Sequence, residues 1–199
     1  MCRIYATGVD VVWKAGALLV PLPADIHSEP LDVPMTADAI PIANDQDRQH
    51  IEDYLKHPDH KAYAVKSMPP IASFPGSGWN TSSEAVRMVI ERCADWYQAP
   101  CLLISVDGML TLQIPKSWRI IGLFMLTTDP QMTNQDKQRV GEVYREKEWR
   151  ALARGAGGWY PVADAPSEAA AVDGALGACA AHDRDCQLYA IGNFRVADQ

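Results

Sequence analysis

The chain carries nearly the same phrase near both ends: residues 2–13 read CRIYATGVDVVW and residues 186–197 read CQLYAIGNFRVA. A weaker copy, CLLISVDGMLTL, fills residues 101–112. In each copy a Cys is followed by apolar and small residues, then a turn signal, then further apolar residues. The turn signals are Gly8, Asp107-Gly108 and Gly192-Asn193. Two short apolar runs joined by such a turn are typical of a β-hairpin, so the sequence predicts three hairpins.

A long helix is predicted before the second hairpin and again before the third. The stretches are SSEAVRMVIERC, residues 82–93, and SEAAAVDGALGAC, residues 167–179. Apolar residues recur in them at helical spacing, and the two series lie 86 positions apart: Val86, Val89, Ile90 and Cys93, then Val172, Ala175, Leu176 and Cys179. Each stretch opens on Ser with an early Glu, as helices often do. Gly174 and Gly177 weaken the second helix by roughly 1 kcal/mol each relative to Ala.

The match between the two halves continues further upstream. QDRQHIEDY at residues 46–54 pairs with QDKQRVGEVY at residues 135–144, and HKAYAV at residues 60–65 pairs with WRALAR at residues 149–154. Trp79 and Trp159 each follow a glycine-containing turn. The repeating unit is therefore a short helix, a strand, a Gly/Pro-rich turn with Trp, a long helix, a Cys loop and a hairpin.

These elements predict an α+β protein made of two tandem repeats that pack together. Repeat 1 is expected at residues 40–118 and repeat 2 at residues 119–199. Residues 1–17 are expected to be a hairpin left over from an incomplete repeat. Residues 18–39, rich in proline, are expected to form an extended connector over the surface. The apolar segment WRIIGLFML, residues 118–126, is expected to be a buried strand.

Four of the five cysteines fall into two equivalent pairs, Cys93 with Cys101 and Cys179 with Cys186. Each pair joins the end of a long helix to the first residue of the next strand, which suits a local disulfide. A loop of that size contributes about 2–3 kcal/mol of stability. Zinc sites and redox pairs prefer closer spacings. Reduced cysteines buried as small hydrophobic side chains remain the alternative.

Disulfides favour the periplasm or the outside of the cell. Residues 1–13 contain no signal peptide, which by itself would indicate the cytoplasm. Two interpretations of the orphan hairpin are open. In the favoured one, the start lies too far downstream, so that a signal peptide, half a repeat and the partner of Cys2 are missing. In the other, the chain is a fragment whose orphan strand pairs with a neighbouring unit.

Composition argues against several classes of partner. The net charge is −7 and no basic block occurs, so binding to nucleic acid is not expected. The apolar run AGALLVPLPA, residues 15–24, is too short to span a bilayer and carries two prolines. Walker, Rossmann and nucleophile-elbow motifs are missing from the sequence, so no cofactor and no catalytic residue is predicted.

Two groups of possible metal ligands receive a structural interpretation instead. The first is KHPDHK, with His57, Asp59 and His60, where Pro58 predicts a helix stop and His60 aligns with Trp149. The second, in the Cys loop of repeat 2, consists of His182, Asp183 and Asp185. Its counterparts in repeat 1 are Trp96, Tyr97 and Ala99. Because the counterparts are not ligands, a solvated loop is expected and no metal site is predicted.

The remaining polar and aromatic candidates are also given structural roles. Asp10, Asp107 and Asn193 lie at or beside hairpin turns, which explains them. The six tryptophans are expected mostly in the core or in strands. They are Trp13, Trp79, Trp96, Trp118, Trp149 and Trp159. Several of them on one exposed face would suit sugar or peptide binding by stacking.

The series HKAYAV, GSGW, SSEAV, PCLLISV and CQLYAIGNFRV resembles a repeat found in uncharacterised secreted or periplasmic bacterial proteins. In those proteins an HKAFAV-like strand, a Trp, a Ser-Glu-Ala helix ending in Cys and a Cys-x-Leu-Tyr-Ala strand recur. The resemblance covers most of residues 40–198 and implies an envelope or secreted location, without an established activity. We expect a non-enzymatic, disulfide-stapled binding or accessory module with a protein or glycan ligand. The alternative is a small-molecule or glycan-processing enzyme.

Overall fold

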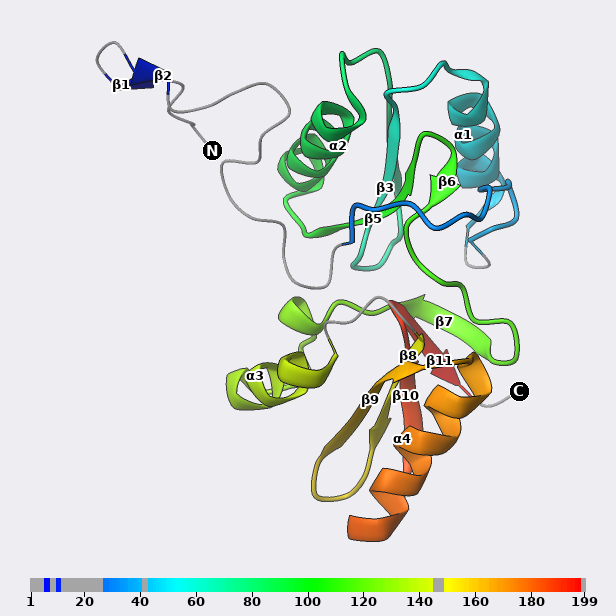
Figure 1. The fold of residues 1–199 in the computed structure, drawn as a ribbon, viewed down its shortest axis with the longest axis vertical. Coiled ribbons are helices and arrows are strands. Elements are labelled where there is room, and N and C mark those ends of the chain that lie inside the picture. The colour runs from blue at the N-terminus through cyan, green and yellow to red at the C-terminus, as the bar shows by residue number, and fades with distance from the viewer. Residues whose placement is uncertain (1–5, 8–9, 12–26, 41–42, 145–148, 198–199) are drawn as a thin grey trace. The chain divides into compact units, whose positions relative to one another are not determined.

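A computed structural model describes residues 6–7, 10–11, 27–40, 43–144 and 149–197 (Figure 1). The chain divides into two compact units. Unit 1 comprises Met1–Ala39 and Ala43–Thr111, and unit 2 comprises Ile40–Ile42 and Leu112–Gln199. Helices and antiparallel sheets occur in both, so the predicted α+β class is confirmed. That the units pack together stays a prediction.

Unit 1 is a four-stranded antiparallel sheet with two helices. Its helices are α1 (Asp45–Lys56) and α2 (Ser82–Tyr97). Its strands are β3 (Ala62–Lys66), β4 (Ser73–Gly76), β5 (Cys101–Val106) and β6 (Met109–Leu110), in the spatial order β4-β3-β5-β6. The helix α1 begins at an Asn44 cap that shares a capping box with Asp47, and it ends before Pro58. In Figure 1, α1 and α2 lie on opposite sides of the sheet.

The hairpin of unit 1 turns where the sequence predicted. Asp107 and Gly108 both have positive φ, at 50° and 78°, as a two-residue type I′ turn requires. Every residue of β5 is buried, which fits a central strand covered on both faces.

Part of the proline-rich connector is built into the sheet of unit 1. The Leu110 N–H donates to the Val33 carbonyl at 2.8 Å, and the Met35 N–H donates to the Gly108 carbonyl at 2.8 Å. Met35 is buried. Most of the described residues 27–39 are exposed, so the segment is an extended one along the outer edge of β6, where it satisfies backbone groups that would otherwise be unpaired. That residues 18–39 as a whole form a surface connector stays a prediction.

Unit 2 is a five-stranded antiparallel sheet with two α-helices and one short 3₁₀ helix. The helices are η1 (Leu126–Thr128), α3 (Asn134–Val143) and α4 (Glu168–His182). The strands are β7 (Arg119–Leu123), β8 (Trp149–Arg154), β9 (Trp159–Ala165), β10 (Gln187–Ile191) and β11 (Phe194–Ala197). Their spatial order is β7-β11-β10-β8-β9.

The two faces of the unit 2 sheet bury different side chains. Ala151 and Ala153 of β8 pack with Val172, Ala175 and other residues of α4. On the opposite side, Leu152 packs in a second cluster with Val140 of α3 and with aromatic residues. Alternate residues of a strand point to opposite faces, so one helix covers each face. The small alanines of β8 let α4 approach the sheet closely.

Two details of the predicted unit need correction. The Gly/Pro-rich turns with Trp are largely strands, β4 and β9, and Trp159 is itself the first residue of β9. Both are edge strands, where a proline such as Pro75 or Pro161 removes no required ladder bond. The predicted buried strand is β7, another edge strand, whose Arg119 and Ile121 are exposed.

Each unit has the same order of main elements after its edge segment: helix, strand, strand, helix, strand, strand. Strand order also corresponds, since β4-β3-β5-β6 and β9-β8-β10-β11 run alike, and residues 31–35 lie beside β6 as β7 lies beside β11. That the two units arose by duplication stays a prediction.

At the N-terminus, β1 (Ala6–Thr7) pairs antiparallel with β2 (Asp10–Val11). This pairing agrees with the first predicted hairpin. Its turn residue Gly8, together with Cys2 and Trp13, lies outside the described residues. Among the described residues, no helix combines the length and the apolar composition that a membrane crossing requires.

Candidate functional site

Both predicted disulfides are present. Cys93 in α2 is bonded to Cys101, the first residue of β5, with their Cα atoms 6.1 Å apart. Cys179 in α4 is bonded to Cys186, just before β10, with Cα atoms 5.9 Å apart. Cys93, Cys101 and Cys179 are buried, so each bond holds the end of a long helix against the inner part of its sheet.

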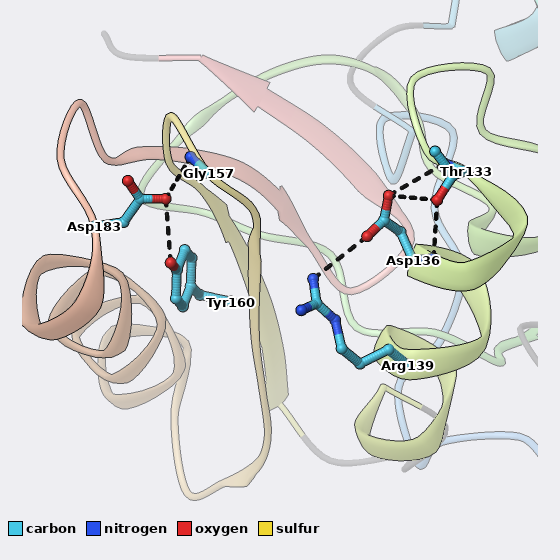
Figure 2. A network of polar contacts seen from close by, with 6 residues as sticks. All are labelled: Thr133, Asp136, Arg139, Gly157, Tyr160 and Asp183. Atoms are coloured by element: carbon cyan, nitrogen blue, oxygen red, sulfur yellow. Dashed lines mark hydrogen bonds and ion pairs between the residues drawn. The ribbon is translucent and has the colours of Figure 1, made fainter.

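The densest polar arrangement in unit 2 joins the Cys loop to the glycine turn, which we define as residues 155–158 (Figure 2). The Asp183 carboxylate accepts hydrogen bonds at Oδ2 from the Gly157 N–H, at 2.7 Å, and from the Tyr160 hydroxyl, at 3.1 Å. The Arg184 N–H donates to Oδ1 at 2.8 Å. Asp183 thus connects the end of α4 with the β8–β9 hairpin.

The Asp183 carboxylate can approach this turn closely because Gly155 and Gly157 have no side chain. A Cβ atom on Gly155 would collide with the Asp183 carboxylate, and one on Gly157 would lie 3.3 Å from its Oδ2. The Gly155 N–H donates to the Gly158 carbonyl at 2.9 Å, which closes the turn. Glycine is thus required at position 155 for a close approach rather than for an unusual φ.

Hydrogen bonding sets the charge state of this carboxylate. The backbone N–H groups of Arg184 and Gly157 hold the pKa of Asp183 below its ordinary value, and the Tyr160 hydroxyl acts in the same direction. Burial and the neighbouring Asp183 raise the pKa of Tyr160. Tyr160 therefore stays a neutral donor and Asp183 stays an ionised acceptor at neutral pH.

The helix α3 contributes a further cation near the glycine turn. Thr133 caps α3 and shares a capping box with Asp136, whose carboxylate lies 3.4 Å from the Arg139 guanidinium. Figure 2 shows Arg139 extending from α3 toward the strand that carries Tyr160. One guanidinium nitrogen lies 3.5 Å from where a Cβ of Gly158 would be.

A second polar arrangement in unit 2 is partly buried. The Tyr189 hydroxyl donates to Asp129 at 2.8 Å, and the Arg195 guanidinium stacks on the Tyr189 ring at 3.9 Å. Arg195 also lies 3.8 Å from the Asp129 carboxylate. Burial, together with the Asp129 charge, raises the pKa of Tyr189. Its partners and its place in the aromatic cluster make this arrangement a structural one.

Both units place a buried cation over a tyrosine at the C-terminal end of an α-helix, Tyr54 in α1 and Tyr144 directly after α3. The Lys61 ammonium lies 5.3 Å from the centre of the Tyr54 ring, and the Arg150 guanidinium lies 5.2 Å from that of Tyr144. Lys61 is 5% exposed and Arg150 is 4% exposed. The Lys61 ammonium also donates to the carbonyls of Leu55 and His57 at the end of α1. These cations fasten helix to sheet.

Unit 1 brings a serine, a histidine and an aspartate together at the start of α2. The Ser82 hydroxyl donates to the Asp107 carboxylate and lies 3.2 Å from Nδ1 of His60. In the hydrolase triad the histidine stands between serine and aspartate. Here the serine stands in the middle, and its proton is directed at the carboxylate. The arrangement ties the hairpin turn to the helix start.

The remaining residues that were considered as possible metal ligands, and given structural roles, do not meet at one point. His57 caps the C-terminal end of α1, and Asp59 is exposed beside it. In unit 2, His182 ends α4 and Asp185 is exposed in the Cys loop. In the part of the chain that the structure describes, no three His, Cys, Asp or Glu side chains are grouped to hold a metal ion.

The tryptophans have diverse environments. Trp159 is buried against Tyr189, with ring centres 4.7 Å apart, while Trp118 and Trp149 pack against the core on the α4 side. Trp79 covers Gly76 so closely that a Cβ there would collide with the indole ring. Trp96 differs, because it is 76% exposed in the last turn of α2.

Sequence reasoning missed Asp183 as an organising residue. Asp183 and Gly157 are 26 positions apart, and no local pattern connects an acid in one loop with a glycine in another. The available signal was GAGGW, residues 155–159, which indicated a turn but also marks backbone that another group approaches closely. No protein-family model, curated protein or solved structure matches this chain.

Proposed function

We propose that the protein is a non-enzymatic, disulfide-stapled binding or accessory module of the cell envelope or the extracellular space. The observation that carries this proposal is the pair of disulfides, one at the end of each long helix. Such bonds persist in oxidising compartments and are rare where glutathione and thioredoxin keep thiols reduced. The resemblance to secreted or periplasmic repeat proteins supports the same location.

Thiol trapping in the source cells tests this location. The cells are lysed directly into acid and denaturant, and free thiols are alkylated before any reductant is added. We expect the protein to carry at most one alkyl group, because four of its five cysteines are bonded. Alkylation of all five cysteines would show that the protein resides in a reducing compartment, and the proposal would fail.

Exposed Trp96 supports a binding role for unit 1. An indole that is 76% exposed offers a flat apolar surface on which a sugar ring or a peptide side chain stacks. A panel of glycans and peptides, screened by tryptophan fluorescence, is the direct test. We expect a hit to lose at least tenfold in affinity with W96A, while W118A at a packed site should mainly lower stability. A glycan or peptide whose affinity is unchanged by W96A would contradict binding at Trp96.

The enzyme alternative has one arrangement in its favour, the contact of Ser82 with His60 and Asp107. A fluorophosphonate probe reacts with activated serines and distinguishes the two functions. The binding-module proposal expects no labelling, because Ser82 directs its proton at the Asp107 carboxylate rather than at the His60 ring. Labelling of the wild type that S82A abolishes and S83A retains would instead support a serine hydrolase.

A further inference from the structure

In unit 2, a backbone N–H of the glycine turn and a hydroxyl of the neighbouring strand β9 donate to the same carboxylate oxygen. The Gly157 N–H and the Tyr160 hydroxyl both donate to Oδ2 of Asp183, at 2.7 Å and 3.1 Å. Two donors that meet at one oxygen in this way also suit an oxygen of another carboxylate, which is a hydrogen-bond acceptor only. The anion in this structure is a side chain of the same protein.

Space and charge around the turn also suit an anion. The positions where Gly155 and Gly157 lack a Cβ are filled by the Asp183 carboxylate. Arg139, whose side chain is 59% exposed, places a guanidinium nitrogen 3.5 Å from the Cβ position of Gly158. This guanidinium adds positive potential beside the turn without touching Asp183 in any contact of the described structure.

Unit 1 shows that the fold does not require a carboxylate at this position. The counterpart of Asp183 in the cysteine-based alignment is Tyr97, four residues after the first cysteine of its pair. The Tyr97 hydroxyl donates to the Ser73 carbonyl at 2.8 Å, so a neutral side chain joins the end of α2 to β4 there. The carboxylate and its glycine receptor are therefore a property of unit 2.

We propose that the glycine turn is a carboxylate receptor that Asp183 occupies, and that an external carboxylate binds there once the Asp183 side chain is removed. The receptor consists of the Gly157 N–H and the Tyr160 hydroxyl, with the Arg139 guanidinium nearby. The ligand class is a small monovalent carboxylate such as acetate. This inference is independent of the proposed function.

The test uses the full chain with D183A and measures thermal unfolding in acetate, in acetamide, and in chloride at the same ionic strength. We expect acetate to raise the Tm of D183A by roughly 5 °C at about ten times its dissociation constant, and further with the logarithm of its concentration. Acetamide and chloride should not do so. Wild type and D173A, which removes an exposed acid of α4, should show no specific acetate effect because Asp183 fills the receptor.

A second variant identifies the donors. In D183A/Y160F we expect the affinity for acetate to fall by about fivefold, because one of the hydrogen bonds is lost. If D183A does not fold in plain buffer, acetate must restore its refolding yield and acetamide must not. A D183A protein on which acetate and acetamide act alike, in stability or in refolding, would overturn the receptor.

Discussion

At the scale of single residues, the side chains that organise each unit are buried or half-buried polar groups that reach across the fold. Lys61 and Arg150 each place a cation over a tyrosine ring. The Asp183 carboxylate accepts a hydrogen bond from the Gly157 N–H, which lies in another loop. None of these roles follows from local sequence, because each depends on which loops meet in the folded chain. The cysteines were predictable, since their spacing and repetition are visible in the sequence itself.

Replacement of Lys61 tests the buried cation. Lys61→Met keeps the apolar stem but removes the donor to the Leu55 and His57 carbonyls. We expect the free energy of unfolding to fall by about 2 kcal/mol, as for other lost hydrogen bonds to charged groups. Lys56→Met, in an exposed ion pair with Asp53, is the matched control and should change little. Equal effects in urea denaturation would contradict the role given to Lys61.

The pH dependence of stability tests the Asp183 carboxylate. Its folded pKa lies below the ordinary value of 3.8, so its contribution is fully present above that pH and is lost as the pH falls through the lowered pKa. Wild type should therefore exceed D183N in stability at neutral pH, and the difference should shrink in acid. Tyr160, which faces the same carboxylate, stays neutral over this range because its pKa is raised. A difference independent of pH would exclude an ionised Asp183 as its cause.

At the scale of elements, the sequence predicted the short and the long helix of each unit, and it predicted the hairpins that turn at Asp107-Gly108 and at Gly192-Asn193. The edge segments were harder. Proline in β4 and β9 looked like a turn signal, yet an edge strand tolerates it because one side of its backbone makes no ladder bond. The extended segment around Val33 could not be predicted from the sequence, because its hydrogen-bonding partner β6 is distant in the sequence.

Two glycine substitutions test the close approaches. Gly155→Ala should destabilise unit 2 by more than about 1 kcal/mol, because its Cβ collides with the Asp183 carboxylate. Gly177→Ala lies in α4 with open space around its Cβ position, and it should stabilise the protein by about 0.5–1 kcal/mol. The opposite order of stability in thermal unfolding would be inconsistent with the described packing.

Removal of each disulfide tests how much the covalent link between helix and strand contributes to stability. The double variants C93A/C101A and C179A/C186A should each lose about 2–3 kcal/mol, because the closed loops are of nearly equal length. Urea denaturation of the unreduced proteins gives the comparison. If a variant is as stable as the wild type, its bond does not constrain the unfolded chain as assumed.

At the scale of the whole molecule, two units of corresponding strand order each join a long helix to a central strand through a disulfide. A covalent bond at the corresponding place in both units is the feature on which the proposed compartment and the proposed function rest. The two disulfides could be predicted from the sequence. The hydrogen-bond donors around Asp183 and the pairing of the edge segments could be identified only from the folded structure.

Peptide mapping of the purified, unreduced protein tests this central claim most directly. The protein is unfolded, alkylated, digested without reductant and analysed by mass spectrometry. The account predicts one linked peptide pair containing Cys93 and Cys101, a second containing Cys179 and Cys186, and at most one alkylated cysteine. Alkylation of all five cysteines, or a bond between the cysteines of different pairs, would contradict it.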